Sequence, residues 1–247
     1  MFPVDKKVVI ITDLRTPEAQ SAQEYLAQQG YEVLGVPETV SLCDEEALSA
    51  FAESCRDRLC GVIHPAPPRV LGGIDTVTEE DWIKAREEGP IAAFVVTKVF
   101  CGIFRDKKEG SMIYLNSIHA EKPVGKGFLF SMGCGAVQML AREVNLDYGT
   151  DNVNVFFVQR GIVEDDLYCR SDASHLYCGV DLRYPLRRIP ENGNLNGMLA
   201  FLLTPAAQPL TGSDLRADSG MTMYYTHRHM VEGSKRLGLM ANLPFSG

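Results

Sequence analysis

The sequence lacks the features that would mark a membrane, metal-binding or nucleic-acid-binding protein. It has no run of about 18 apolar residues, so no segment is expected to cross a bilayer. The formal net charge of −8 argues against nucleic acid and against an anionic membrane surface, since both attract a basic face. No Cys-x-x-Cys or His-x-x-x-His pair occurs, so neither a disulfide framework nor a zinc site is expected.

The composition is that of an ordinary globular protein. The chain has 247 residues, of which 45% are apolar and 23% are charged, so it can enclose a sizeable core. Two lysines near the N-terminus precede a short apolar stretch, which is too short for a signal peptide and is typical of a first buried strand. We therefore expect a cytoplasmic protein that contacts neither nucleic acid nor a membrane.

Apolar runs of strand length alternate with amphipathic segments of helix length. Strands are expected at Lys6–Thr12, Tyr31–Val36, Cys60–Ile63, Ser111–Leu115, Val153–Val158 and Ser213–Ala217. Helices are expected at residues 17–29, Asp44–Cys55, Glu79–Phe104 with a kink or break at Gly89-Pro90, onward from Phe128, and Gly193–Leu203. This alternation predicts a single-domain α/β fold, a doubly wound Rossmann-like parallel sheet with helices on both faces. We expect residues 1–223 to form this domain and residues 224–247 to form a C-terminal tail, which belongs to the domain or contacts another subunit.

The stretch from Ser111 to Leu146 combines a buried strand, a loop that opens at Asn116-Ser117 and a long helix. This combination resembles the catalytic segment of the short-chain dehydrogenase/reductase (SDR) family. Other segments resemble the family in the same order over nearly the whole chain, among them VTEEDWIKAREEGPIAAFVVTKVF, VNVFFVQRGIVEDD and LTGSDLRADSGM. The resemblance implies the SDR fold, NAD(P)-dependent oxidoreduction and pairing of subunits through two helices.

The four positions of the SDR active site are only partly kept. The family serine is present as Ser117, whereas Phe130 stands at the tyrosine position, Cys134 at the lysine position and Gly89 at the asparagine position. In the family the tyrosine donates the proton that reduction of a carbonyl requires, and the lysine lowers the pKa of that tyrosine. Phe130 has no proton to donate, and Cys134 carries no fixed charge. Ordinary SDR catalysis is therefore not expected.

The loop that would bind a dinucleotide is also changed. The SDR pattern places glycines after the first strand so that the backbone can approach the pyrophosphate, but here the loop reads TDLRTPEAQ. Asp13, Pro17 and Ala19 stand at the glycine positions, and Pro17 removes an N–H donor. Asp13 and Glu18 bring negative charge to the place of the two phosphates, and Arg15 could offset some of this charge. No cofactor is therefore expected. The enoyl reductase branch of the family also lacks the usual glycines, so NAD(P) bound in an unusual way stays open.

Further positions that contact the cofactor in SDR enzymes differ as well. The NNAG turn of the family corresponds to His64–Pro67, the acid after its third strand to Ser41, and its Pro-Gly turn to Arg160-Gly161. The threonine downstream of that turn corresponds to Asp165. These losses on both sides of one cleft indicate a cleft that no longer serves nucleotide chemistry.

Some side chains could still give the cleft a chemistry of its own. Cys134 could act as a nucleophile if a helix N-terminus and His119 lowered its pKa, or it could fill the space of a lysine, which we favour. Ser117 could bind a carbonyl oxygen or bond only the loop backbone, and we favour the second role. His64, His119, Cys134 and Asp165 could converge as a metal site or an acid–base pair, although such histidines more often make one local hydrogen bond. No metal is expected.

We therefore expect an SDR-like protein that is catalytically inactive and acts through association. Its partner would be a second copy in a dimer or tetramer, an SDR paralogue or an unrelated enzyme, bound through the helices that carry Phe94–Val99 and Ala136–Val144. The alternatives are an oxidoreductase that binds NAD(P) in an unusual way, a cofactor-independent enzyme that uses the emptied cleft, and a ligand sensor. Residues 164–190 suit a protein contact, an anionic ligand or a solvated cap over the cleft.

Overall fold

The structure, a computed structural model, describes residues 6–67, 69–70, 72–123, 125–163, 184–186 and 188–223. The chain forms two compact units, of which the first comprises Met1–Arg160 with Gly193–Arg216 and the second comprises Gly161–Asn192 with Ala217–Gly247. The α-helices named below belong to the first unit. None of the helices in the described ranges is long and apolar enough to cross a membrane.

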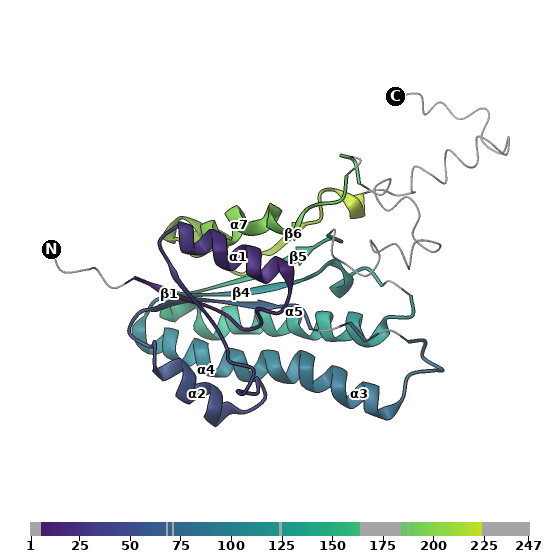
Figure 1. Ribbon diagram of the computed structural model, residues 1–247, viewed down its shortest axis with the longest axis horizontal. Helices are drawn as coiled ribbons and strands as arrows, with labels where there is room; N and C mark the ends of the chain where they lie inside the picture. Colours follow the sequence, from purple (N-terminus) through teal and green to yellow (C-terminus); the bar gives the residue numbers. More distant parts are fainter. Residues whose placement is uncertain are drawn as a thin grey trace. The chain divides into compact units, whose positions relative to one another are not determined.

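A six-stranded sheet forms the centre of the first unit (Figure 1). Its order is β2-β1-β3-β4-β5-β6, and β1 to β5 pair in parallel. The strands are β1 (Val8–Ile11), β2 (Glu32–Gly35), β3 (Leu59–Pro65), β4 (Gly110–Ser117), β5 (Val153–Arg160) and β6 (Asp214–Ala217). In Figure 1 one side of the sheet carries α1 (Pro17–Gln28) and α7 (Asn196–Leu202), and the other carries α2 (Glu45–Glu53), α3 (Glu79–Arg86), α4 (Ala92–Lys107) and α5 (Phe128–Tyr148). The predicted doubly wound, Rossmann-like parallel sheet is confirmed.

Capping side chains explain where three of the helices begin. The Thr16 hydroxyl accepts a hydrogen bond from the Ala19 N–H at 3.2 Å, and Pro17 follows at the first helical position of α1. The Asp44 carboxylate accepts from the Ala47 N–H at 3.0 Å at the start of α2. At α3, Thr78 and Asp81 bond to each other's backbone N–H groups in a capping box. The sequence therefore contains the start signals of these helices in readable form.

No strand forms between β2 and α2. Residues 36–44 make turns in which the Val40 N–H donates to the Pro37 carbonyl at 2.9 Å and the Cys43 N–H donates to the Ser41 hydroxyl at 3.2 Å. The sequence predicted no strand in this segment, and the structure agrees. As a result β2 lies at the edge of the sheet, and Ser41 does not occupy the end of a strand.

The helix that follows β3 does not break at Gly89-Pro90. A π-helical turn, Glu87–Ile91, joins α3 directly to α4. The wider π-turn accommodates Pro90, which has no N–H to donate and whose ring crowds the preceding turn of an α-helix. The helix is irregular at the predicted position, Gly89-Pro90, but the irregularity is a π-turn and not a break.

The second unit has a small set of its own contacts. Tyr184 is fully buried, and its hydroxyl donates to the Ile162 carbonyl at 2.6 Å. The Asp218 carboxylate accepts from the Gly220 N–H at 3.0 Å and from the Thr222 N–H at 2.9 Å. Most of residues 164–190, including Asp165, lie outside the described residues. The expected roles of this segment therefore stay predictions.

The core between β4 and α4 contains a buried chain of hydroxyl groups. The Thr97 hydroxyl donates to the Ala93 carbonyl at 2.7 Å and therefore accepts its second bond, of 2.6 Å, from the hydroxyl of Tyr114. Tyr114 is fully buried and Thr97 is 4% exposed. Burial and the low dielectric hold the pKa of Tyr114 well above its usual value. The tyrosine is a neutral structural donor at physiological pH.

Replacing Thr97 by valine should expose the dependence of the core on this bond. Thr97→Val keeps the shape of the side chain but leaves the Tyr114 hydroxyl buried without its acceptor, so the free energy of unfolding should fall by about 1–3 kcal/mol. Adding Tyr114→Phe should recover part of that loss. Urea unfolding measures both effects, and Thr150→Val, at an exposed position, is the control. Equal losses in Thr97→Val and Thr150→Val would contradict the assignment.

Candidate functional site

The carboxyl ends of four neighbouring strands, β1, β3, β4 and β5, lie together at one end of the sheet. Doubly wound folds bind their ligands at this end of their strands. β1 ends beside Thr12, β3 carries His64 near its end, β4 ends at Ser117 and β5 ends at Arg160. Ser117 and Arg160 are direct register partners across β4 and β5. The structure thus brings together most of the described site residues that the sequence singled out.

The loop after β1 satisfies its own charges. The Asp13 carboxylate accepts from the Arg15 N–H at 2.9 Å, from Nε at 2.9 Å and from Nη2 at 2.7 Å. These bonds to Arg15 hold the pKa of Asp13 below its usual value. The Ala19 N–H donates to the Thr16 hydroxyl, and Pro17 has no N–H. The backbone N–H groups of Arg15 and Ala19 are therefore already bonded within the loop.

A buried ion pair lies behind this loop and was not predicted from the sequence. Glu18, in the first turn of α1, lies 3.0 Å from the Arg160 Nε at the end of β5. The two side chains are only 10% and 15% exposed. A carboxylate at a helix N-terminus is favoured by the helix dipole, as a phosphate would be. Glu18 thus places the chain's own anion at the terminus that binds pyrophosphate in dinucleotide folds.

His64 is a neutral, buried residue. Its Nδ1 lies 2.8 Å from the Thr12 hydroxyl, and its ring packs edge-on against Tyr114 with centroids 6.4 Å apart. Burial lowers the pKa of His64 to about 4, against a weaker opposing effect of the Asp13 charge. The histidine therefore makes a local hydrogen bond and stays uncharged at neutral pH.

The loop after Ser117 is bonded to itself. The Ser117 hydroxyl accepts from the His119 N–H at 3.3 Å, and the Ser117 N–H donates to the Asn116 side chain at 2.7 Å. The His119 ring is buried, and its Nδ1 lies 2.7 Å from the Lys122 carbonyl, so Nδ1 is the protonated nitrogen. The Ser117 hydroxyl thus bonds to the backbone of its own loop, and its role stays a prediction.

Glu121 ties the same loop to three other elements. Its carboxylate accepts from Gln138 of α5 at 3.0 Å, from Gln159 of β5 at 2.8 Å and from Arg216 of β6 at 2.6 Å. The hydrogen bonds from Gln159 and Gln138 hold the pKa of Glu121 below its usual value. Sequence reasoning did not find this network, because its four members are far apart in the chain.

Phe130, at the family tyrosine position, is packed between two side chains. It is 3% exposed, its ring lies 5.9 Å from the His119 ring at 69°, and the guanidinium carbon of Arg69 lies 5.3 Å from its centroid. The Arg69 contact is a cation–π interaction, which favours a phenyl ring without needing its hydroxyl. Arg69 was missed in the sequence because it only follows the proline-rich turn after β3.

Cys134 and Gly89 are enclosed in the same way. Cys134 is fully buried, and burial raises the pKa of its thiol to about 12, so it is protonated at neutral pH. This is the property of a packing residue and not of a nucleophile. A Cβ atom added at Gly89 would lie 3.3 Å from the Pro67 Cβ, so an asparagine there would press on the turn after β3.

The described residues contain no cluster of three or more histidine, cysteine or acidic side chains that could hold a metal ion. His64 bonds to Thr12 and His119 to Lys122, so each has a local partner. Asp165 lies outside the described residues. The suggested site of His64, His119, Cys134 and Asp165 is therefore not assembled by its described members.

Comparisons with known proteins give one family and one fold. The family model described as enoyl-(acyl carrier protein) reductase matches residues 6–222. A tropinone reductase homologue of Arabidopsis thaliana is 21% identical over 208 residues, which are 79% of this chain and 76% of that protein. The solved structure of ElxO with NADP bound has a TM-score of 0.80 at 15% identity and matches 89% of this chain and 100% of its own. A gluconate 5-dehydrogenase from Burkholderia cenocepacia, in complex with NADP and tartrate, has a TM-score of 0.79 at 16% identity over 90% of this chain and 97% of its own.

The buried neutral His64 should make stability depend on pH. Between the ordinary histidine pKa of 6.5 and the folded value of about 4, the unfolded chain binds a proton at His64 that the folded protein does not. The free energy of unfolding should therefore fall as the pH is lowered through this range, by up to about 1.4 kcal/mol per pH unit from this group. Urea unfolding at several pH values should show a shallower fall in His64→Asn. Identical slopes in the two proteins would contradict the prediction.

Proposed function

Because the chain belongs to the short-chain dehydrogenase/reductase family, we propose that it keeps the family fold as a scaffold, has lost dinucleotide-dependent catalysis, and acts by associating with another protein chain. The observation that carries this proposal is the buried Glu18–Arg160 ion pair at the N-terminus of α1. It puts a carboxylate where the fold would otherwise receive the pyrophosphate of a cofactor.

The residues present do not fit NAD(P) bound in the usual way. Two like charges about 4 Å apart repel by roughly 1–4 kcal/mol in water or in a partly wet site, so the Glu18 carboxylate opposes a pyrophosphate. Arg160 is engaged by Glu18, and Arg15 by Asp13. Pro17 and Ala19 offer no N–H beyond the one that Thr16 accepts. The proposed function therefore includes no reaction of a nicotinamide cofactor.

Catalysis also lacks its proton donor. Phe130 has no ionisable proton, and the Cys134 thiol is buried with its pKa raised to about 12. Neither group can protonate a carbonyl oxygen at neutral pH. Ser117 remains, but it accepts its bond from the loop backbone. An oxidoreductase that binds NAD(P) in another way is the second candidate, supported by the retained Ser117 and by structural neighbours that hold NADP.

The association surface that we propose spans α3, the π-turn, the start of α4 and α5. Trp82 is 41%, Met132 50% and Met139 52% exposed, and Phe94 on α4 is 53% exposed. Met132 and Met139 are seven residues apart and so share one side of α5. Between α3 and α5 lies a groove of about 100 Å³, lined mainly by the apolar side chains of Trp82, Ala85, Pro90, Leu129, Met132 and Ala136.

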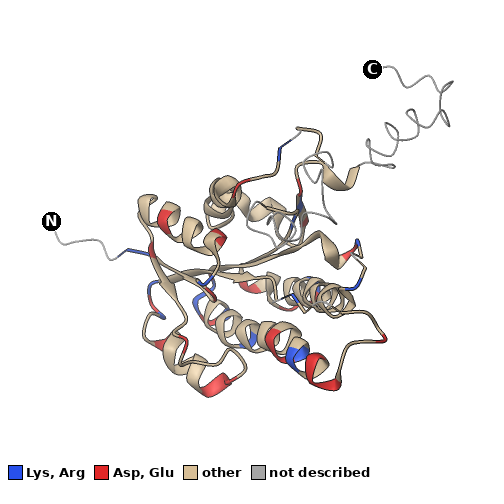
Figure 2. Ribbon diagram, turned by 45° about the vertical axis from the view of Figure 1, so that its right-hand side comes forward, with Lys and Arg blue, Asp and Glu red and all other residues tan. Residues whose placement is uncertain are grey.

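The borders of this surface are charged. The first turn of α3 carries Glu79, Glu80 and Asp81, and its last turn carries Lys84 and Arg86; acidic and basic positions are coloured along the helices in Figure 2. An apolar centre with a polar rim is the composition of protein–protein interfaces. We favour a second copy of the chain as the partner, since one surface with both signs of charge on its rim can pair with itself in a twofold dimer.

Titration with NADH and NADPH tests the loss of cofactor binding. At millimolar concentrations of either cofactor, we expect no change in the melting temperature or in the fluorescence of Trp82, the single tryptophan of the chain. A ligand that bound the folded state well below that concentration would stabilise it by more than about 2 kcal/mol. Such a rise with either cofactor would overturn the proposal in favour of the oxidoreductase.

A pair of substitutions on α1 tests the ion pair itself. Glu18→Gln leaves the guanidinium of Arg160 buried without this carboxylate, so it should lower the free energy of unfolding by about 3 kcal/mol. Glu24→Gln changes an exposed carboxylate on the same helix and should leave the free energy of unfolding nearly unchanged. If the two substitutions lowered the free energy of unfolding equally, the Glu18–Arg160 ion pair would not stabilise the fold, which would contradict the prediction.

Light scattering tests the association surface. We expect the wild-type protein to have the mass of a dimer or larger, and Phe94→Glu or Met139→Glu to weaken association by about tenfold or more, because a charge would replace an apolar side chain at the contact. Phe201→Glu, at a position on α7 that is 41% exposed, is the matched control and should not change the mass. A wild-type monomer that co-purifies with no partner would contradict the association role.

A further inference from the structure

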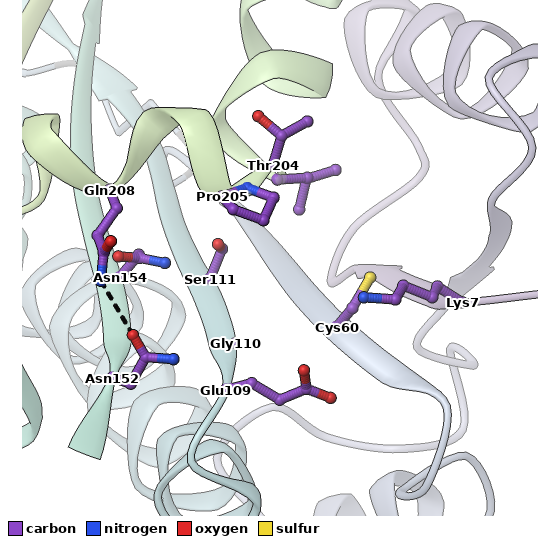
Figure 3. Close-up of a pocket in the computed structure, with 11 residues that line it drawn as sticks. Lys7, Cys60, Glu109, Gly110, Ser111, Asn152, Asn154, Thr204, Pro205 and Gln208 are labelled. Atoms are coloured by element: carbon purple, nitrogen blue, oxygen red, sulfur yellow. Dashed lines mark hydrogen bonds between the residues drawn. The ribbon is translucent and has the colours of Figure 1, made fainter.

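A pocket lies at the amino-terminal ends of the strands, whereas the candidate site lies at their carboxyl ends. Figure 3 shows the residues that line this pocket. It is formed where β4 and β5 begin and is covered by residues that follow α7. Its volume is about 210 Å³, which is below the roughly 300–1,000 Å³ that suits drug-sized ligands. The pocket is therefore of a size for a small metabolite and is separate from the position of any dinucleotide.

Strand register gives this pocket a polar floor. Gly61, Ser111 and Asn154 are consecutive register partners across β3, β4 and β5, so their Cβ positions share one face of the sheet. At Gly61 the space is taken by Leu203, whose Cδ2 lies 2.2 Å from where a Cβ would stand. Ser111 and Asn154 continue the row into the pocket (Figure 3). A serine and an asparagine are unusual on a covered face of a parallel sheet, where apolar residues are the rule.

Neither of these two side chains bonds to another described residue of the protein. Ser111 is 4% exposed, and its hydroxyl has no hydrogen-bond partner within the described ranges; the same holds for the Asn154 amide. Asn154 is partly buried, and both side chains line the pocket. The hydroxyl and amide are thus in place to bond to a small polar molecule in the pocket.

Opposite charges stand at the rim. Lys7, just before β1, and Glu109, just before β4, both line the pocket, and Figure 3 shows their side chains entering its open side. The Lys7 ammonium has no ion-pair partner in the part of the chain that the structure describes, and Glu109 has only the distant ammonium of Lys107, at 3.8 Å. One positive and one negative group above a neutral polar floor match a molecule that carries both charges.

We propose that this pocket binds a small zwitterion of amino-acid size. Its carboxylate pairs with Lys7, its ammonium group pairs with Glu109, and its remaining polar atoms bond to Ser111 and Asn154. A ligand with one charge would use only one of Lys7 and Glu109, and the volume of about 210 Å³ limits the ligand to a small molecule. The site needs no cofactor and does not depend on whether the opposite cleft binds a dinucleotide.

The experiment adds the common L-amino acids one at a time to the full-length protein and follows binding by saturation-transfer NMR and calorimetry. At least one should bind with a dissociation constant in the millimolar range or tighter. Lys7→Gln and Glu109→Gln should each weaken that binding by about tenfold, and Ser111→Ala should weaken it less, since it removes one neutral hydrogen bond. Lys98→Gln and Glu45→Gln, which break an exposed ion pair on α4 and α2, are the charge-matched controls and should leave it unchanged.

Acetate and methylammonium separate the zwitterion from simpler ligands, because each carries one of the two charges. Both should bind far more weakly than the amino acid. The proposal is overturned if no amino acid binds, if the Lys7 and Glu109 variants bind as tightly as the wild type while keeping its melting temperature, or if acetate alone binds as well as the amino acid.

Discussion

The register of β4 against its two neighbours determines where the polar side chains of this protein meet. β4 pairs with β5 from Gly110 to Ser117, and at the carboxyl end this pairing sets Ser117 beside Arg160. At the amino end the same pairing sets Ser111 beside Asn154. A shift by one residue would turn these side chains to the other face of the sheet. The candidate site at the carboxyl ends of the strands and the pocket at their amino ends therefore depend on the same set of backbone hydrogen bonds.

Local signals in the sequence were sufficient for most of the fold. Runs such as Val8–Ile11 are apolar on every residue, which only a strand covered on both faces requires, and Thr78 with Asp81 marks a helix start by its own chemistry. One feature could not be read in this way. Gly89-Pro90 marked an irregularity in the helix, but not its form, a π-turn at Glu87–Ile91 that keeps α3 joined to α4.

The sequence predicted which elements carry the candidate site residues, but not the contacts that their side chains make. Sequence comparison placed Phe130 and Cys134 correctly on α5, because their spacing from Ser117 is fixed along the chain. It could not pair Glu18 with Arg160, since only the fold brings residues so far apart in the sequence within 3.0 Å. Arg69 was missed for the same reason: its contact with the Phe130 ring is set by the path of the loop after β3.

Phe130 and Gly89 are each packed against another segment of the candidate site, and this packing supports the proposed loss of SDR catalysis. The phenyl ring of Phe130 is covered by the charge of Arg69, and the position of Gly89 leaves only 3.3 Å between a new Cβ and Pro67. A side chain restored at either place would therefore meet atoms that belong to another substituted segment. Packing of this density resists single changes, because a misfit of one methylene in a close-packed interior already costs about 1–3 kcal/mol. Under the proposed scaffold role, restoring a tyrosine at Phe130 or an asparagine at Gly89 alone would therefore not restore catalysis, because each would also require its neighbouring segment to move.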